Sequence, residues 1–277
     1  MASDDEAVSD GSVKKRSIRQ YLSADLDTKW ADVPLLACFF CSGLIDSMAF
    51  NMYGCFVSMQ TGNTIFLGLG VNGQPDSAPR YSWSKSLAAI LCFALGALFF
   101  SSFHRVFGPQ RRWVLLANFA LQALLVAVVA VVATTLAVPN HPATVVTAHD
   151  AQWLRFALPA KFPASDFAPI ALLAFQSAGQ IVASRCLKFN AMPTVVLTSL
   201  YCDLMSDAQL FTAPLPANAD RNRRFLGAVL LLVGAVCGAY LTRSDAGFMG
   251  GLWIGCFFKA TIAVAWTVWR EKRTEKA

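Results

Sequence analysis

One acidic residue, Asp46, lies inside a long apolar stretch of the sequence, residues 34 to 53. If this stretch crosses a lipid bilayer, an ionised carboxylate within it costs at least ~2.5 kcal/mol on insertion scales. An acidic residue at this depth is therefore a candidate for function, as an acceptor of a proton or a cation. Two structural explanations stay open: Asp46 is hydrated near the interface, or it accepts hydrogen bonds from backbone amides of the next segment.

One basic residue, Lys259, lies near the middle of the apolar stretch 248 to 269, with tryptophans on both sides. Tryptophan favours the membrane interface, so Lys259 is expected at depth, where its side chain reaches water with difficulty. Three interpretations stay open: an ion pair with Asp46 or Asp203, a water-filled cavity around the amine, or a side chain that extends to the interface.

A third apolar stretch, residues 55 to 71, is interrupted near its middle by four polar or small residues: Gln60, Thr61, Gly62 and Asn63. The glycine lets the chain break or approach a ligand closely. If a half-helix starts here, its free amides and the positive end of its dipole favour an anion or a carbonyl oxygen. The alternative is a packing motif, in which Thr and Asn form hydrogen bonds between helices.

A second interrupted stretch, residues 191 to 211, contains Pro193, Thr198 and Asp203. Every backbone polar group in lipid needs a partner, so breaks at membrane depth are tolerated only where protein or water covers them. Both stretches are therefore predicted to be half-helices or re-entrant segments. Isolating each polar side chain in hydrocarbon costs a few kcal/mol, so we expect them to share one midplane cavity, formed by Asp46, Gln60, Thr61, Gly62, Asn63, Gln180, Thr198, Asp203 and Lys259.

Two more polar residues, Asn118 and Gln122, are one helical turn apart in the apolar stretch 113 to 135, so they share a helix face. Hydrogen bonding between helices and contact with a ligand are the two interpretations.

No pattern in the sequence predicts catalysis, and we expect neither an enzyme nor a cofactor. There is no phosphate-binding loop, nucleophile elbow or zinc-protease motif, and the three histidines lack metal-ligand spacing, so no metal site is predicted. The net charge of +6 comes from basic residues at the ends of apolar stretches without interleaved aromatic residues, so no nucleic-acid partner is predicted.

The composition itself indicates a membrane protein. Of the 277 residues, 56% are hydrophobic and 14% are charged, whereas a soluble domain carries about 25% charged residues. About 20 apolar residues in a helix cross a bilayer. Six stretches meet this condition: residues 34 to 53, 86 to 103, 113 to 135, 167 to 185, 225 to 242 and 248 to 269.

The basic residues predict the orientation, because short cytoplasmic loops are enriched in Lys and Arg. With six spans and both interrupted stretches returning to their own side, most basic residues fall on the side of the two termini, which is therefore predicted to be cytoplasmic. Eight full spans are the alternative. The predicted divisions are a disordered cytoplasmic tail (1–32), a first membrane repeat (33–137), an extracytoplasmic loop (138–166), a second membrane repeat (167–269) and a cytoplasmic tail (270–277).

The two membrane repeats have the same plan: a span, an interrupted segment and two more spans. An odd number of crossings in each makes the second inverted, an architecture found in many secondary transporters. The predicted fold is thus an all-α membrane protein with about six transmembrane helices and two broken or re-entrant segments, arranged as two inverted repeats.

The first repeat resembles the YoaK-like family of multi-spanning membrane proteins of unknown function. The resemblance lies in G-L-I-D-S (Gly43 to Ser47) and G-C-F-V-S-M-Q-T-G-N (Gly54 to Asn63), since that family has a G-x-x-D helix followed by T-G-N. It extends over about residues 30 to 270. In the second repeat, Ile181 and Ser199 replace the Asn and the Gly of the family pattern.

These patterns favour a transporter or channel for a small solute or an ion, with its site between the interrupted segments. The alternative is a membrane scaffold or interaction protein, whose buried polar groups only fix helix packing. The expected partners are the lipid bilayer and a small-molecule or ion substrate, and a homo-oligomer is compatible with the sequence. Which membrane holds the protein is not encoded in these patterns.

Overall fold

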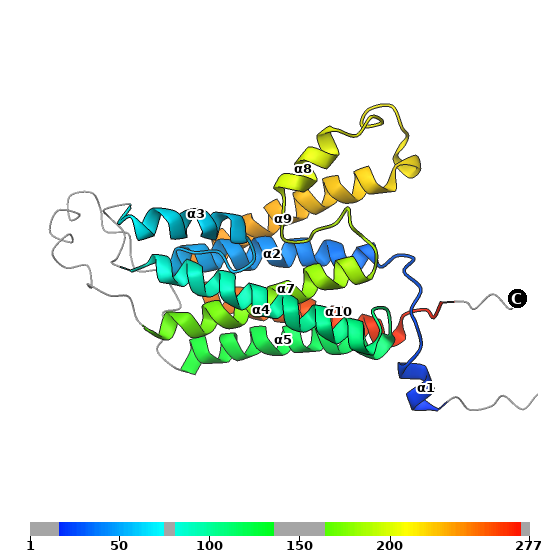
Figure 1. The fold of residues 1–277 in the computed structure, drawn as a ribbon, viewed down its shortest axis with the longest axis horizontal. Coiled ribbons are helices and arrows are strands. Elements are labelled where there is room, and N and C mark those ends of the chain that lie inside the picture. Colours follow the sequence, from blue (N-terminus) through cyan, green and yellow to red (C-terminus); the bar gives the residue numbers. More distant parts are fainter. Residues whose placement is uncertain (1–16, 75–80, 136–163, 273–277) are drawn as a thin grey trace, which may run out of the picture.

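A computed structural model of the chain describes residues 17–74, 81–135 and 164–272. Within these ranges the chain forms helices and no β-strand, apart from two isolated bridges. Six long helices run side by side in a bundle (Figure 1), namely α2 (Asp32–Tyr53), α4 (Trp83–Phe107), α5 (Arg112–Thr135), α7 (Phe167–Cys186), α9 (Ala219–Arg243) and α10 (Gly247–Val268).

These six helices are long and apolar enough to cross a bilayer. They contain 20 to 25 residues each, which at a rise of 1.5 Å per residue covers the ~30 Å hydrocarbon core. The mean hydropathy of their most apolar windows is 1.4 to 2.5. The prediction of an all-α fold with six spans is confirmed, and the chain is a multi-pass membrane protein in a lipid environment.

The first interrupted stretch is re-entrant. α2 ends at Gly54, which adopts a left-handed conformation (φ 71°), and residues 55–59 fold back along the bundle. α3 (Gln60–Val71) then runs from inside the bundle to the end where α2 finished (Figure 1).

The second interrupted stretch follows the same course from the opposite end of the bundle. After α7 the chain turns back inward, and α8 (Thr198–Met205) leads out again beside the start of α9 (Figure 1). A short 3-10 turn, η2 (Leu215–Ala217), precedes α9. Beyond α8, Asp207 accepts hydrogen bonds from the Asn218 side chain and the Gln209 amide, at 2.9 Å each. These hydrogen bonds lower the pKa of the Asp207 carboxyl and fix the turn between α8 and α9.

Glycines allow two pairs of spans to pack closely. A Cβ on Gly234 of α9 would lie 2.1 Å from the Phe40 carbonyl oxygen of α2. A Cβ on Gly96 of α4 would lie 2.4 Å from the Phe175 carbonyl oxygen of α7. Neither pair of helices could approach this closely with a larger residue. The third main pair is α5 with α10.

Both ends of the described chain meet at one end of the bundle. The Asp27 amide donates to the Arg270 carbonyl at 2.9 Å. The buried Arg112 guanidinium donates to the carbonyls of Thr267 and Trp269, at 2.8 Å each, so it covers free carbonyls at the end of α10. A cation also suits the negative end of the helix dipole.

Residues 17–31 differ from the disordered tail expected for residues 1–32. They include α1 (Ile18–Leu22), and Leu26 and Ala31 are buried against the spans. The contacts with the end of α10 explain why this polar segment is ordered.

The outer part of the predicted tail, residues 1–16, lies outside the described residues. So do residues 273–277 and most of the predicted loop 138–166, of which the structure places the 3-10 turn η1 (Ala164–Asp166). The division into two repeats stays a prediction.

Candidate functional site

Asp46 is buried in α2 and holds the first re-entrant segment in place. Its side chain is 1% exposed. Oδ1 accepts hydrogen bonds from the amides of Val57 and Ser58, at 2.8 Å each, and Oδ2 accepts one from the Ser58 hydroxyl. Residues 54–59 are not helical, so these amides need partners from elsewhere in the bundle. Of the alternatives left open by the sequence, the structure contains the backbone contact.

Gln60 and Asn63 are engaged in the same segment. Asn63 is buried, accepts a hydrogen bond from the Phe56 amide at 2.9 Å, and donates to the Phe56 carbonyl at 2.7 Å and to Gln60 at 2.8 Å. Gln60 donates to the Val57 carbonyl at 3.0 Å. Gly62 lies under the Phe56 ring, where a Cβ would be only 2.8 Å away. These residues therefore shape the re-entrant turn.

Lys259 is fully buried in α10, and two glutamines surround its amine. It donates to Gln122 Oε1 of α5 at 2.6 Å and to Gln180 Oε1 of α7. In the described part of the chain, no carboxylate lies within ion-pair distance of it. Neither the ion pair nor the extension to the interface is present, because amide oxygens from two neighbouring spans accept the hydrogen bonds instead.

A chain of hydrogen bonds leads from Lys259 toward the end of the bundle that holds the termini. Gln122 donates to Asn118 at 2.8 Å, Asn118 contacts His104 Nε2 at 2.9 Å, and His104 Nδ1 contacts the Pro109 carbonyl at 3.1 Å. The shared face of Asn118 and Gln122 was predictable from their spacing. The buried position of His104 was not, because a histidine near the end of a span suggests the interface.

Two serines connect the spans with the re-entrant segments in a reciprocal way. Ser42 of α2 donates to the Thr194 carbonyl, before α8, at 2.9 Å. The Ser177 hydroxyl of α7 is shared between the Val57 carbonyl, before α3, at 3.1 Å and the Ala174 carbonyl of its own helix at 2.8 Å. Gln180 joins this network by donating to Ser42 at 2.6 Å. Sequence reasoning missed both serines, since single serines are common in membrane spans.

A small cavity lies where these groups meet. Its volume is about 10 Å³, and it is lined by Cys41, Ser42, Ile45, Val57, Ser58, Gln176, Ser177 and Gln180. This volume accommodates about one water molecule. Ser58 is a partner of Asp46, and Gln180 is a partner of Lys259, so one partner of each buried ionisable group lines the cavity. Gln176 Oε1 is buried and has no hydrogen-bond partner among the residues that the structure describes.

The structure does not bring all the predicted site residues together. Gln180 lines the cavity, and Asp46, Lys259 and Gln60 contact residues that line it. Asn63 bonds to Phe56 and Gln60 in the adjoining turn. Thr61, Thr198 and Asp203 are exposed and are not among the lining residues. The cluster is therefore smaller than expected, because Thr61 lies on the outward side of α3, and Thr198 and Asp203 lie on the outward side of α8.

Both half-helices nevertheless begin without a side-chain cap. The residue before α3 is Met59 and the residue before α8 is Leu197, and neither side chain accepts a hydrogen bond from the helix. Amides in the first turn of each half-helix thus keep their capacity to donate.

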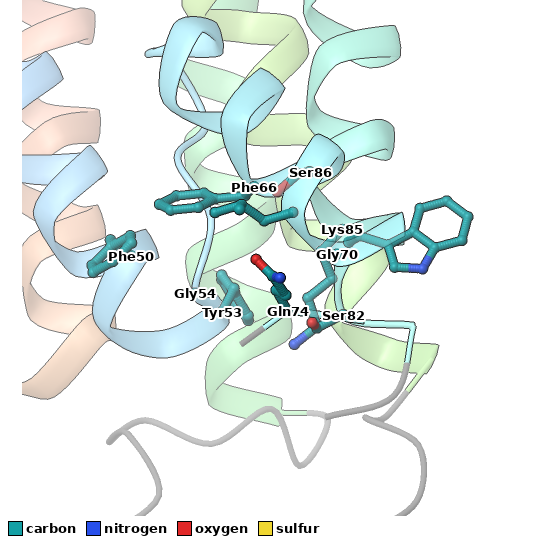
Figure 2. Close-up of a pocket in the computed structure, with 11 residues that line it drawn as sticks. Phe50, Tyr53, Gly54, Phe66, Gly70, Gln74, Ser82, Lys85 and Ser86 are labelled. Carbon is teal, nitrogen blue, oxygen red and sulfur yellow. The ribbon is translucent and has the colours of Figure 1, made fainter. Parts of the chain in front are cut away.

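A larger pocket lies near the other end of the bundle, between α2, α3 and the start of α4. Its volume is about 260 Å³. Figure 2 shows aromatic residues of α2 and α3 around it, together with Gln74, Ser82 and Lys85. Lys85 pairs with Asp166 at 2.6 Å, and the buried Tyr53 hydroxyl has no hydrogen-bond partner within residues 17–74, 81–135 and 164–272. In the described residues no three His, Cys, Asp or Glu side chains are grouped to hold a metal.

The comparisons with known proteins agree with this architecture. Searches among curated proteins and among solved structures gave no match. A family described as "Protein of unknown function (DUF1275)" matches residues 34–265. This range includes both re-entrant segments and all six spans, apart from the first residues of α2 and the last residues of α10. The YoaK-like resemblance is consistent with this family of membrane proteins. The chain therefore belongs to the DUF1275 family.

Proposed function

We propose that this protein carries an ion or a small solute across a membrane, through the interface where the two re-entrant segments meet. One observation supports this most directly. Asp46 and Lys259 are both buried and are held by neutral groups instead of by each other. One partner of each, Ser58 and Gln180, lines the same water-sized cavity.

The cost of these buried charges favours transport over a purely structural role. Burying a carboxylate or an ammonium in a low-dielectric interior costs several kcal/mol, and well-packed apolar residues are often equal or better for stability. Polar and ionisable groups in spans typically mark pathways for ions, protons or substrates. The buried acid and the buried base are therefore best explained by chemistry that uses them.

One observation favours the scaffold alternative. Asp46 and Asn63 both form hydrogen bonds with backbone groups of the segment just before α3. A packing role requires such contacts. A scaffold should show no saturable flux of any solute, so the transport assay below separates the two functions.

We also infer that the two repeats are related by a two-fold axis in the membrane plane, and reciprocal contacts support this. The hydrogen bond from Ser42 to the Thr194 carbonyl has its counterpart in that from Ser177 to the Val57 carbonyl. An inverted repeat places its discontinuous segments across such an axis from one another.

Close helix contacts follow the same relation. The contact of Gly234 with the Phe40 carbonyl corresponds to the contact of Gly96 with the Phe175 carbonyl. Ser42 is related to Ser177 by the same sequence offset as Phe40 to Phe175.

The cytoplasmic side is proposed to be the end where Asp27 meets Arg270, since this end carries the basic residues of the loop between α4 and α5. Cysteines introduced at Ser244 and Lys272 should then react with a membrane-impermeant maleimide from opposite sides. Reaction of both from the same side would contradict this orientation.

Purified protein in liposomes tests the proposed function. Pyranine inside the vesicles reports protons, labelled Na⁺, K⁺ and phosphate report ions, and osmotic swelling reports small neutral solutes. We expect saturable flux of at least one of these probes.

The critical variant is Asp46→Asn, which keeps the side-chain shape and removes the charge. We expect flux to fall at least about tenfold, equivalent to about 1.4 kcal/mol. The matched control is Asp245→Asn, because Asp245 is exposed in the turn between α9 and α10. Absence of saturable flux for every probe, or normal flux in Asp46→Asn, would contradict the proposal.

A further inference from the structure

The contacts of Asp46 leave room for one more hydrogen on its carboxylate. Two oxygens offer about four lone-pair positions. The amides of Val57 and Ser58 take two on Oδ1, and the Ser58 hydroxyl takes one on Oδ2. One position on Oδ2 remains.

The chemistry around this carboxylate suits a proton and does not suit a metal cation. A hard cation needs several oxygen ligands that present lone pairs. Asp46 is surrounded by three donors, whose hydrogens would face such a cation. A proton needs only one lone pair, and the Ser58 hydrogen already points at one on Oδ2.

The cavity beside Ser58 contains an acceptor with no donor. Gln176 is 2% exposed, and its Nε2 donates to the Leu173 carbonyl at 3.1 Å, which leaves Oε1 as the free atom. A buried acceptor without a partner costs on the order of 1–3 kcal/mol. Gln176 and Ser58 line the same cavity, so a hydrogen of Ser58 that pointed into the cavity would reach Gln176 directly or through one water.

We propose that Asp46 binds the proton that drives transport and that the Ser58 hydroxyl delivers it. A proton from the cavity side adds to Ser58 Oγ while the hydroxyl's original hydrogen moves to Asp46 Oδ2. The serine hydroxyl is restored, the carboxylate becomes a carboxylic acid, and one proton has moved. The new acid O–H then donates to Ser58 Oγ, and the serine hydrogen points toward Gln176 Oε1.

This proton transfer changes which span the re-entrant segment is bonded to, from α2 to α7. A carboxylate accepts charge-assisted hydrogen bonds, which are about twice as strong as neutral ones. Protonation of Asp46 therefore weakens the attachment of Val57 and Ser58 to α2. The new contact from Ser58 to Gln176 adds to the existing one from Ser177 to Val57, so the segment becomes attached to α7. A bound proton is thereby coupled to the wall of the cavity.

Other titratable groups surround Asp46 on several elements. Cys55 belongs to the re-entrant segment itself and interacts electrostatically with Asp46, Lys85 and Asp166. Lys259 of α10 donates to Gln180, which lines the cavity. Cys41 lies on α2 itself, five residues before Asp46, and lines the cavity. Cys237 of α9 packs against the hydrophobic cluster that includes residues of α2. On α7, the groups facing the cavity are Gln176, Ser177 and Gln180, none of which titrates.

Infrared spectroscopy tests the proton site apart from transport, although the coupling role rests on the proposed function. The purified protein in lipid should show a carboxylic-acid C=O band that grows as pH falls between about pH 9 and 3. The contribution of Asp46 should appear in the difference between the spectra of the wild type and Asp46→Asn, because the other carboxyl groups are common to both proteins. The amide of Asp46→Asn also reproduces the donor of the protonated acid and so preserves the fold. In Ser58→Ala the band should shift in frequency, because the acid O–H loses its acceptor.

Proton flux into pyranine-loaded liposomes tests the delivery step. We expect Ser58→Ala and Gln176→Leu to lower the flux at least about tenfold. The matched controls are Ser47→Ala, because Ser47 bonds to Leu44 within α2, and Gln209→Leu, because Gln209 is exposed. Both controls should retain the wild-type flux.

The outcomes separate the two proposals. If no band is lost in Asp46→Asn, or if Ser58→Ala and Gln176→Leu conduct protons normally, the proton site is overturned even when labelled ions or solutes still move. If the band titrates as described and no probe is transported, the proton site stands and the proposed function fails.

Discussion

The buried lysine shows how individual side chains meet the demands of the bundle interior. Gln122 and Gln180 approach Lys259 from two different spans, and each uses its amide nitrogen to continue a hydrogen-bonded chain away from the amine. Both chains therefore have their donors directed outward from Lys259. Removing the amine leaves two buried amide oxygens without donors.

Lys259→Met should accordingly destabilise the protein although methionine fits an apolar span. Each unpaired buried acceptor costs about 1–3 kcal/mol, and about 1 kcal/mol shifts the melting temperature by roughly 2–4 °C for a chain of this size class. We expect the apparent melting temperature in detergent to fall by at least about 4 °C. Lys272→Met is the control, because Lys272 is exposed. An unchanged melting temperature in Lys259→Met would contradict this account of the amine.

The depth of Asp46 and Lys259 in the membrane was predictable from the sequence, whereas their hydrogen-bond partners were not. The lengths of the apolar stretches place Asp46 and Lys259 inside the bilayer, because helix rise is constant. Nothing in the spacing indicated that Ser58 or Gln122 would contact them, since those contacts depend on how the spans rotate and pack. In the sequence, Arg112 is one of the basic residues between two apolar stretches and indicates only the orientation, yet it is buried because the end of α10 needs donors for its carbonyls.

At the scale of elements, the spans and their interruptions followed from composition. Long apolar stretches must be helical in lipid, and a glycine or proline among polar residues must be covered by protein. The outward orientation of Thr61 and Thr198 could not be inferred in this way. It depends on the sides of α3 and α8 that pack on α4 and α9.

Close packing of α2 on α9 gives a prediction about one glycine. A Cβ on Gly234 would lie 2.1 Å from a backbone oxygen, so Gly234→Leu forces the two helices apart. Overpacking of this kind costs typically about 1–3 kcal/mol. We expect a lower apparent melting temperature and a lower yield of monodisperse protein in detergent.

The matched control is Gly68→Ala in α3, because a Cβ there meets nothing within 4 Å. It should be neutral or slightly stabilising, since alanine favours helix over glycine by about 0.5–1 kcal/mol. Equal melting temperatures and equal yields for the two variants would show that the contact between α2 and α9 contributes little to stability.

For the whole molecule, the closed cavity limits what the described conformation can do. A space of about 10 Å³ holds a water-sized guest, so a larger solute requires the re-entrant segments to move apart. The contacts that would have to change are those between each re-entrant segment and the first span of the other repeat, formed by Ser42 and Ser177. Transport by this route therefore needs two alternative arrangements of the same contacts, one open to each side.

The final prediction concerns the two-fold relation between the repeats. Inverted repeats can exchange their conformations, which gives one arrangement open to each side of the membrane. If residues 34–135 and 167–269 are such repeats, an experimental structure in lipid should superpose them by a rotation of about 180° around an axis in the membrane plane. The rotation should exchange Ser42 with Ser177 and Gly96 with Gly234. A conformation open to the opposite side should show the two repeats with their contacts exchanged, so that the hydrogen bond at one serine lengthens while its counterpart stays closed. An axis along the membrane normal, or breakage of both serine contacts in the same conformation, would contradict this mechanism and leave the paired contacts as packing alone.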